Sequence, residues 1–237
     1  MSNSADQQPL IGVPAPVAFL VAVLVAAFFL PPLIWSDWAD RSAFYFAFSP
    51  ARLSGGLVIP QAPGSAYWTM LSYGFLHVGT LHLAVNSLWL LVFGTPVARC
   101  LGGARFFVLS AVSTVAGAIA SLIVHWGEFT LLVGASGAVS GMVGAAIPVM
   151  YGRGAAQNFR SRAPREYYSI LPFADLIRNY RALWFMAIWL FFTLFTGASQ
   201  LILTNALVGG SQIAWEAHLG GFIAGLACIY LLAPRRV

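Results

Sequence analysis

The stretch that decides the fold is residues 80–98, TLHLAVNSLWLLVFGTPVA. It is apolar over the length, about 20 residues, that a helix needs to cross the hydrocarbon core of a membrane. Its polar residues His82 and Asn86 lie four positions apart, on one helical face. Further apolar stretches occupy residues 13–35, 106–126, 136–151, 182–203 and 215–233. The sequence therefore predicts an all-α polytopic membrane protein, a bundle of six transmembrane helices.

Composition agrees with this class. Hydrophobic residues make up 59% of the chain and charged residues 8%, whereas soluble domains carry about a quarter charged residues. No internal repeat or separate soluble domain is evident, so we expect one membrane domain over residues 1–237. The first apolar stretch ends in Pro31-Pro32 and follows no basic residue, which favours a retained helix over a cleaved signal peptide. Cys100 and Cys228 have no disulfide-like or metal-like spacing.

The arginines predict the orientation. All 12 basic residues are arginines. With the N-terminus in the cytoplasm, only Arg41 and Arg52 fall outside, in an external loop at 36–79. The others fall in cytoplasmic segments, which include a loop at 152–181 and the C-terminus, as the positive-inside rule expects. The net charge of +5 therefore indicates membrane orientation and contact with the lipid bilayer rather than nucleic-acid binding.

Three polar side chains are predicted at one depth. His82, Ser136 and His218 precede Arg99, Arg153 and Arg235 by the same interval, which places each about 25 Å above the cytoplasmic boundary in regular helices. Small residues at four-residue spacing would let two of these helices pack backbone to backbone: Gly137, Gly141 and Ala145 in one, and Ala217, Gly221 and Gly225 in the other.

This arrangement predicts a catalytic Ser–His dyad. An imidazole within hydrogen-bond reach of a serine can activate its hydroxyl as a nucleophile. Glu216 is two residues from His218 and points to another side of the helix, so we assign it to the membrane interface near a helix N-terminus. The backbone N–H at Ser136, together with His82 and Asn86, could stabilise an oxyanion. No cofactor or metal is expected.

The combined motifs resemble the rhomboid family of intramembrane serine proteases. The matching segments are residues 77–86, with His77, His82 and Asn86; residues 134–137, Gly-Ala-Ser-Gly; and residues 217–221, Ala-His-Leu-Gly-Gly, followed by Gly225. The resemblance covers nearly the whole chain. It implies that Ser136 is the nucleophile, that His218 is the general base, and that His82 and Asn86 support the oxyanion hole.

The resemblance implies further roles. His77 matches a position just outside the site, where a structural hydrogen bond is favoured. Gly134, Gly137 and Gly221 support the site structurally. Family members often carry an aromatic residue where this chain has Ser140, which leaves open how His218 is oriented. The substrates implied are transmembrane segments of other proteins, with helix five and the loop at 204–214 in the region proposed to gate their access. The compact form resembles bacterial members, which implies a bacterial inner membrane.

Three other functions compete with this interpretation. A catalytically silent relative that binds membrane clients would lack the serine or the histidine, and both are present. A channel or transporter would need a polar path through the inner half of the membrane, where these helices are nearly purely apolar. A zinc protease would need an HExxH motif, which is missing, and we assign His125 to the interface. We expect no obligate protein partner.

Overall fold

The computed structural model describes residues 12–54, 62–152, 168–207 and 214–233, with side chains omitted for 196–207. Within these residues four helical stretches are long and apolar enough to span a membrane: Ala15–Ile34, Thr80–Leu101, Gly103–Val124 and Trp215–Leu232. Two shorter apolar helices, Ser136–Met150 and Tyr180–Phe195, accompany them. The expected all-α, six-helix membrane architecture is confirmed for the described part of the chain.

The first span consists of α1 (Ala15–Phe29) and α2 (Pro31–Ile34), which meet at Leu30. Proline removes a backbone hydrogen-bond donor, so the Pro31-Pro32 pair divides the helix. The second span also has a division. It runs through α6 (Thr80–Trp89), a π-helical turn (Leu90–Gly94) and α7 (Thr95–Leu101). Pro96 lies at the start of α7 and cannot donate to the preceding turn.

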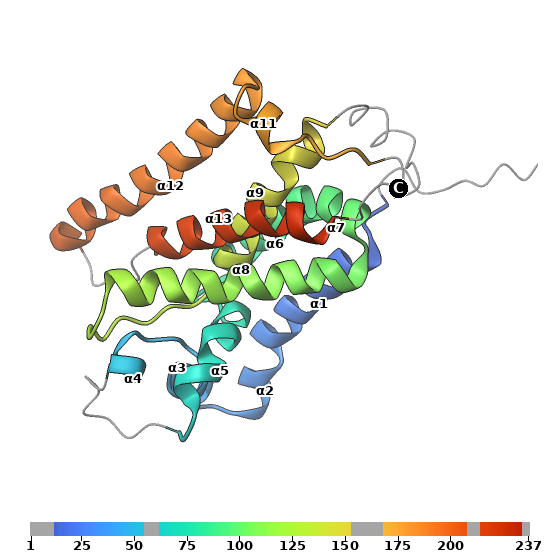
Figure 1. Cartoon of the computed structure of the whole chain (residues 1–237). Helices are drawn as coiled ribbons and strands as arrows, with labels where there is room; N and C mark the ends of the chain where they lie inside the picture. Colours follow the sequence, from blue (N-terminus) through green and yellow to red (C-terminus); the bar gives the residue numbers. More distant parts are fainter. Residues whose placement is uncertain (1–11, 55–61, 153–167, 208–213, 234–237) are drawn as a thin grey trace, which may run out of the picture.

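The centre of the bundle is α9 (Ser136–Met150), whose residues from Gly137 to Val149 are all buried. It packs against α8 (Gly103–Val124) and α13 (Trp215–Leu232). Figure 1 shows α8 and α13 running side by side, with α12 (Tyr180–Leu207) diverging from α13 toward one end of the molecule. A short helix, α11 (Phe173–Leu176), precedes α12. Half of the cytoplasmic loop expected at 152–181, residues 153–167, lies outside the described residues.

Glycines allow the central helices to touch through their backbones. A side chain at Gly221 would overlap the carbonyl of Gly137, and one at Gly225 would overlap the backbone of Gly141. The α8–α13 interface is similarly tight, because a Cβ at Gly220 would lie 2.6 Å from the Ala116 carbonyl oxygen. Small residues therefore set the separation of these helices, as their four-residue spacing predicts.

The external loop is folded in its described parts. It contains α3 (Trp38–Tyr45), α4 (Ala51–Ser54), α5 (Ser65–Ser72) and a 3₁₀ turn (Tyr73–Phe75). The guanidinium of Arg52 donates to the carbonyls of Ala43 and Phe44 and to the Ser65 hydroxyl, and so joins three segments of the loop. Backbone hydrogen bonds between Phe48 and Leu132 fasten the loop to the connection between α8 and α9.

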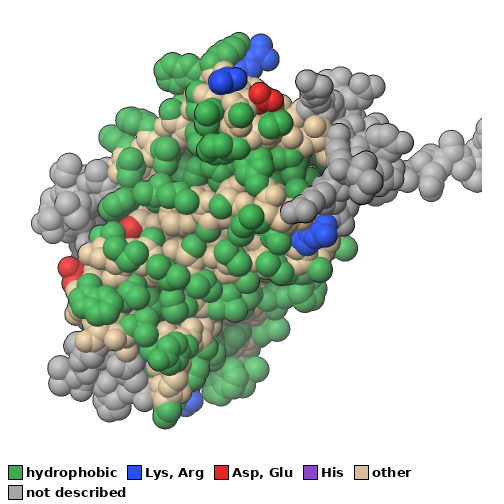
Figure 2. All heavy atoms as spheres, in the orientation of Figure 1, with side chains coloured by type: hydrophobic (Ala, Val, Ile, Leu, Met, Phe, Trp, Pro, Cys, Tyr) green, Lys and Arg blue, Asp and Glu red, His purple; other side chains and the backbone are tan. Residues whose placement is uncertain are grey.

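The surface is dominated by apolar side chains. Figure 2 shows them spread over the face formed by α8, α12 and α13, with the few charged side chains near the periphery. Large side chains such as Phe191, Phe195 and Leu231 are exposed. An exposed apolar surface of this extent is suited to lipid rather than to water.

Gly225→Ala is expected to destabilise the bundle by about 1–3 kcal/mol, because the added methyl group must push apart two backbones that cannot repack independently. Gly103→Ala is the matched control, since a Cβ there meets only Pro16, at 3.9 Å. Thermal unfolding of both variants in detergent micelles measures the difference. Equal midpoints for Gly225→Ala and the parent would contradict the packing described above.

Candidate active site

Ser136 is the first residue of α9, and a glycine turn places it there. Gly134 has φ of +118°, in the region that favours glycine. A Cβ at Gly134 would lie 2.6 Å from Cε1 and 2.8 Å from Nε2 of His82. The imidazole of His82 therefore lies directly against the turn that leads to Ser136. The N–H groups in the first turn of α9 have no partners within the helix, so they are available beside Ser136.

His218 lies in the first turn of α13, where its backbone N–H donates to the Ala214 carbonyl at 3.3 Å. One helical turn later, Gly221 touches Gly137, the residue after Ser136. The two helix starts that carry Ser136 and His218 are therefore held together. Both side chains are half-buried. Among the described residues no hydrogen bond joins the Ser136 hydroxyl to the His218 ring, and such contacts are often long before substrate binds.

His82 and Asn86 lie on the inward face of α6. His82 is close enough to His218 for a charge on one ring to act on the other. Asn86 is 4% exposed, and its Nδ2 donates to the His82 carbonyl at 3.0 Å. That bond holds the amide against the preceding turn of α6 and leaves the second N–H of Nδ2 for another acceptor.

His77 precedes α6, and its ring packs against His82 with 5.0 Å between centroids. Among the described residues neither of its ring nitrogens has a well-aligned hydrogen bond, and the structural hydrogen bond that the sequence favoured stays a prediction. Burial, and then the charge of His82, lower the pKa of His77 to about 4, while the Phe75 backbone offsets part of the shift. His77 is therefore a neutral packing partner of His82 near neutral pH.

Tyr73 is a site residue that sequence reasoning missed. Its carbonyl accepts from the Gly134 N–H at 3.0 Å, and its hydroxyl donates to the Thr114 carbonyl at 2.7 Å. The same hydroxyl lies 2.8 Å from where a Cβ of Gly137 would be. Tyr73 thus supports the turn before Ser136 and the residue after it. The sequence signal for Tyr73 was its position four residues before His77. Because Tyr73 lies in a loop with many aromatic residues, its residue type alone did not single it out.

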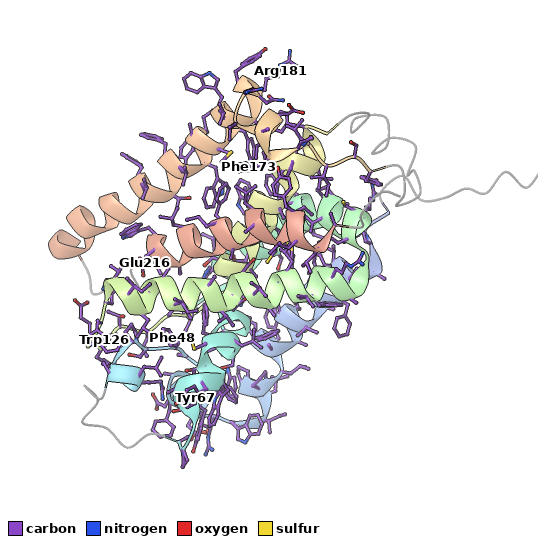
Figure 3. All side chains as sticks on the ribbon, viewed as in Figure 1. Phe48, Tyr67, Trp126, Phe173, Arg181 and Glu216 are labelled. Carbon is purple, nitrogen blue, oxygen red and sulfur yellow. The ribbon has the colours of Figure 1, made fainter. Side chains whose placement is uncertain are left out.

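One expectation about a neighbouring residue changes. Glu216 was assigned to the membrane interface, but it is 4% exposed and lies beside His125. Figure 3 shows Glu216 where α13 begins, next to the end of α8. Its burial follows from packing between two helix ends, which no local sequence pattern reveals. Ser140, one turn beyond Ser136, is buried, and it supplies no aromatic ring to orient His218.

A cavity of about 1090 Å³ lies beside these residues. Its walls include His77, Val133 and Glu216, together with aromatic side chains of α1 and of the segment that follows α2, among them Phe29 and Trp35. Ser136 and His218 are not among its lining residues. The cavity therefore adjoins the site rather than containing it. Within the part of the chain that the structure describes, no cluster of three or more His, Cys, Asp or Glu side chains could hold a metal ion.

His77→Gln is expected to reduce the loss of stability on acidification. The pKa of His77 is about 4 in the folded protein and 6.5 for an ordinary histidine, so the unfolded chain binds the proton more readily. The contribution of neutral His77 to the free energy of unfolding is complete above pH 6.5, and it is lost as the pH falls toward 4. Thermal unfolding from pH 7 to pH 4 should show a shallower decline for the variant. Identical declines for the parent and the variant would contradict the lowered pKa of His77.

Comparison with known proteins places the chain in a family. The model of the Rhomboid domain matches residues 64–235. The "Rhomboid protease GlpG" of Yersinia pestis (strain Pestoides F) is 27% identical over 212 residues, which cover 89% of this chain and 60% of that protein. The "Rhomboid protease GluP" of Bacillus subtilis (strain 168) is 37% identical over 83 residues, 35% of this chain and 16% of that protein.

"RHOMBOID-like protein 4" of Arabidopsis thaliana is 37% identical over 91 residues, 38% of this chain and 23% of that protein. The chain thus matches less than two thirds of the length of each of these relatives. The family match and the apolar helices together show a multi-pass integral membrane protein. Since the family model covers most of the sequence, the chain belongs to the rhomboid family.

Proposed function

We propose that this protein is an intramembrane serine endopeptidase that cleaves transmembrane segments of other membrane proteins with Ser136 and His218. The observation that carries the proposal is the contact between Gly137 and Gly221. Each glycine lies within one helical turn of one of the two side chains, so the contact holds a serine and a histidine near each other. The names of the relatives, rhomboid proteases, support the same activity.

The chemistry follows from these positions. The Ser136 hydroxyl attacks the scissile carbonyl carbon while His218 takes its proton. The C–N bond then breaks, and His218 returns the proton to the leaving amine, which leaves an acyl ester on Ser136. Water next attacks the ester, again giving a proton to His218. The ester bond breaks, the proton returns to the serine oxygen, and the new carboxyl end is released.

The negative oxygen formed in each half of the reaction needs hydrogen-bond donors. The N–H of Ser136 at the start of α9 is one proposed donor, and the positive end of the α9 dipole favours a negative charge there. His82 lies on the Gly134 turn, so its ring is the second. Asn86 on the same face of α6 is the third. Removing a single donor of this kind typically costs about 100-fold or more in rate.

We further propose one membrane domain with both termini in the cytoplasm, in a bacterial inner membrane. The described arginines support this orientation. Arg99 donates to the Gly12 carbonyl at 2.9 Å, which places the start of α1 and the end of α7 at one side of the bundle. Arg52 belongs to the external loop at the other end. The gating segment at 204–214 is part of the proposal, and its residues 208–213 lie outside the described part.

Labelling with a fluorophosphonate probe tests the proposal without knowledge of the substrate. The probe phosphonylates an activated serine with loss of fluoride. Ser136→Ala and His218→Ala should each reduce labelling by at least about 1,000-fold, because the two groups act as a unit. Ser110→Ala, which removes a buried hydroxyl on α8, is the matched control and should label like the parent.

The same variants should then be compared in cleaving a transmembrane substrate in liposomes. Loss of cleavage in Ser136→Ala and His218→Ala alone would agree with the labelling. Undiminished labelling of Ser136→Ala would move the nucleophile to another residue and overturn the assignment. A parent protein that neither labels nor cleaves any membrane segment would favour the client-binding or channel functions instead.

A further inference from the structure

Glu216 carries a buried carboxyl group that the proposed mechanism does not use. It lies in the first turn of α13, two residues before His218, and is 4% exposed. Burying a charged group is costly unless it has a partner. The start of a helix favours a negative charge, but the helix dipole alone does not explain why the carboxylate is turned into the protein rather than toward water.

The partner of Glu216 is His125, the C-cap residue of α8. His125 Nε2 lies 3.5 Å from Oε1 of Glu216, and its Nδ1 lies 2.8 Å from Oε2 of Glu128. His125 thus lies between the carboxyl groups of Glu128 and Glu216. The end of a helix favours positive charge and the start of a helix favours negative charge. The pair therefore joins two helix ends of complementary polarity.

The effect of Glu216 extends to Tyr73. Burial, and secondarily the charge of Glu216, raise the pKa of Tyr73, the residue that supports the Ser136 turn. The interface between α8 and α13 is close along its length, since a Cβ at Gly117 would be 3.0 Å from the Ala217 carbonyl oxygen. Ala217 separates Glu216 from His218. The His125–Glu216 pair thus closes the outer end of an interface already held by backbone contact.

We propose that Glu216 and His125 are positioning residues for the dyad. Glu216 and His218 lie about 200° apart around α13, so Glu216 binds the end of α8 while His218 is presented on another face. The pair fixes the rotation and height of the first turn of α13, and hence the distance from the His218 ring to Ser136. This inference rests on the proposed function, because it assigns the pair a role only in a working Ser–His dyad.

The experiment compares four forms of the full-length chain: the parent, Glu216→Gln, His125→Gln and the double variant. Probe labelling of Ser136, measured well below the unfolding temperature of each form, should slow by about 10-fold or more in both single variants, because small misplacements of a catalytic group are costly. The double variant should be no slower than the slower single variant, since both remove one shared contact.

Glu128→Gln is the matched control. Glu128 binds the other nitrogen of His125, is 59% exposed and makes no ion pair with α13 in the described residues. The labelling rate of Glu128→Gln should stay within about twofold of the rate of the parent, because exposed ion pairs contribute little. With a transmembrane substrate, Glu216→Gln should lower kcat and leave KM nearly unchanged. Amide hydrogen exchange over residues 215–220 should be faster in Glu216→Gln than in Glu128→Gln.

The outcomes separate the two proposals. Parent-like labelling of Glu216→Gln would overturn the positioning role while leaving the protease intact. Slow labelling of Glu216→Gln combined with a parent-like rate for His125→Gln would also overturn it, because Glu216 would then act on His218 without its partner. If Glu216→Gln does not fold, His125→Gln and its exchange pattern decide the question. A parent that neither labels nor cleaves a transmembrane substrate would overturn the proposed function and, with it, the catalytic role of the pair.

Discussion

The outer half of this bundle depends on the direct contact between the backbones of α9 and α13. At Gly221 against Gly137, and again at Gly225 against Gly141, there is no room for a single methyl group. In a membrane there is little hydrophobic gain from burying one apolar helix against another, so close packing must supply the association. The contact also has a geometric result, because it fixes the helix carrying Ser136 relative to the helix carrying His218.

The remaining polar groups are arranged around that contact. Tyr73 braces the turn before α9 from the side of the external loop, and His82 covers the same turn from α6. The external loop is in turn organised by Arg52 and fastened at Leu132. The loop thereby contributes to the precision of the proposed site on the helices, which is the role expected of the shell around a catalytic group.

The parts of this structure that sequence could predict are those with a local signature. Apolar length identified the spans, and the four-residue spacing of Gly221 and Gly225 predicted close helix packing. The common depth predicted for Ser136 and His218 favours one site, and the starts of their two helices are held together at Gly137 and Gly221. The π-helical turn at Leu90–Gly94 has no comparable signature, although Pro96 follows it.

Burial of Glu216 was beyond sequence reasoning for a physical reason. Its partner His125 belongs to another helix, and the two meet only because α8 and α13 pack together. The same applies to Tyr73, whose contacts reach Thr114 and Gly134. Pairs of this kind depend on the approach of distant segments, which periodicity along one helix does not encode.

The dense packing of α9 has a consequence for the membrane as an electrical barrier. Beyond Ser136 the helix is buried residue by residue as far as Val149, and a Cβ at Gly144 would meet the Leu226 amide nitrogen at 3.2 Å. Ions and protons need a hydrated path to cross hydrocarbon. A hydrolytic site of the kind proposed would have to admit water from one side of the bilayer, and the tightly packed part of α9 beyond Ser136 would keep that water from becoming a leak. The helix that would present the nucleophile would then also preserve the ion gradient of the membrane around it.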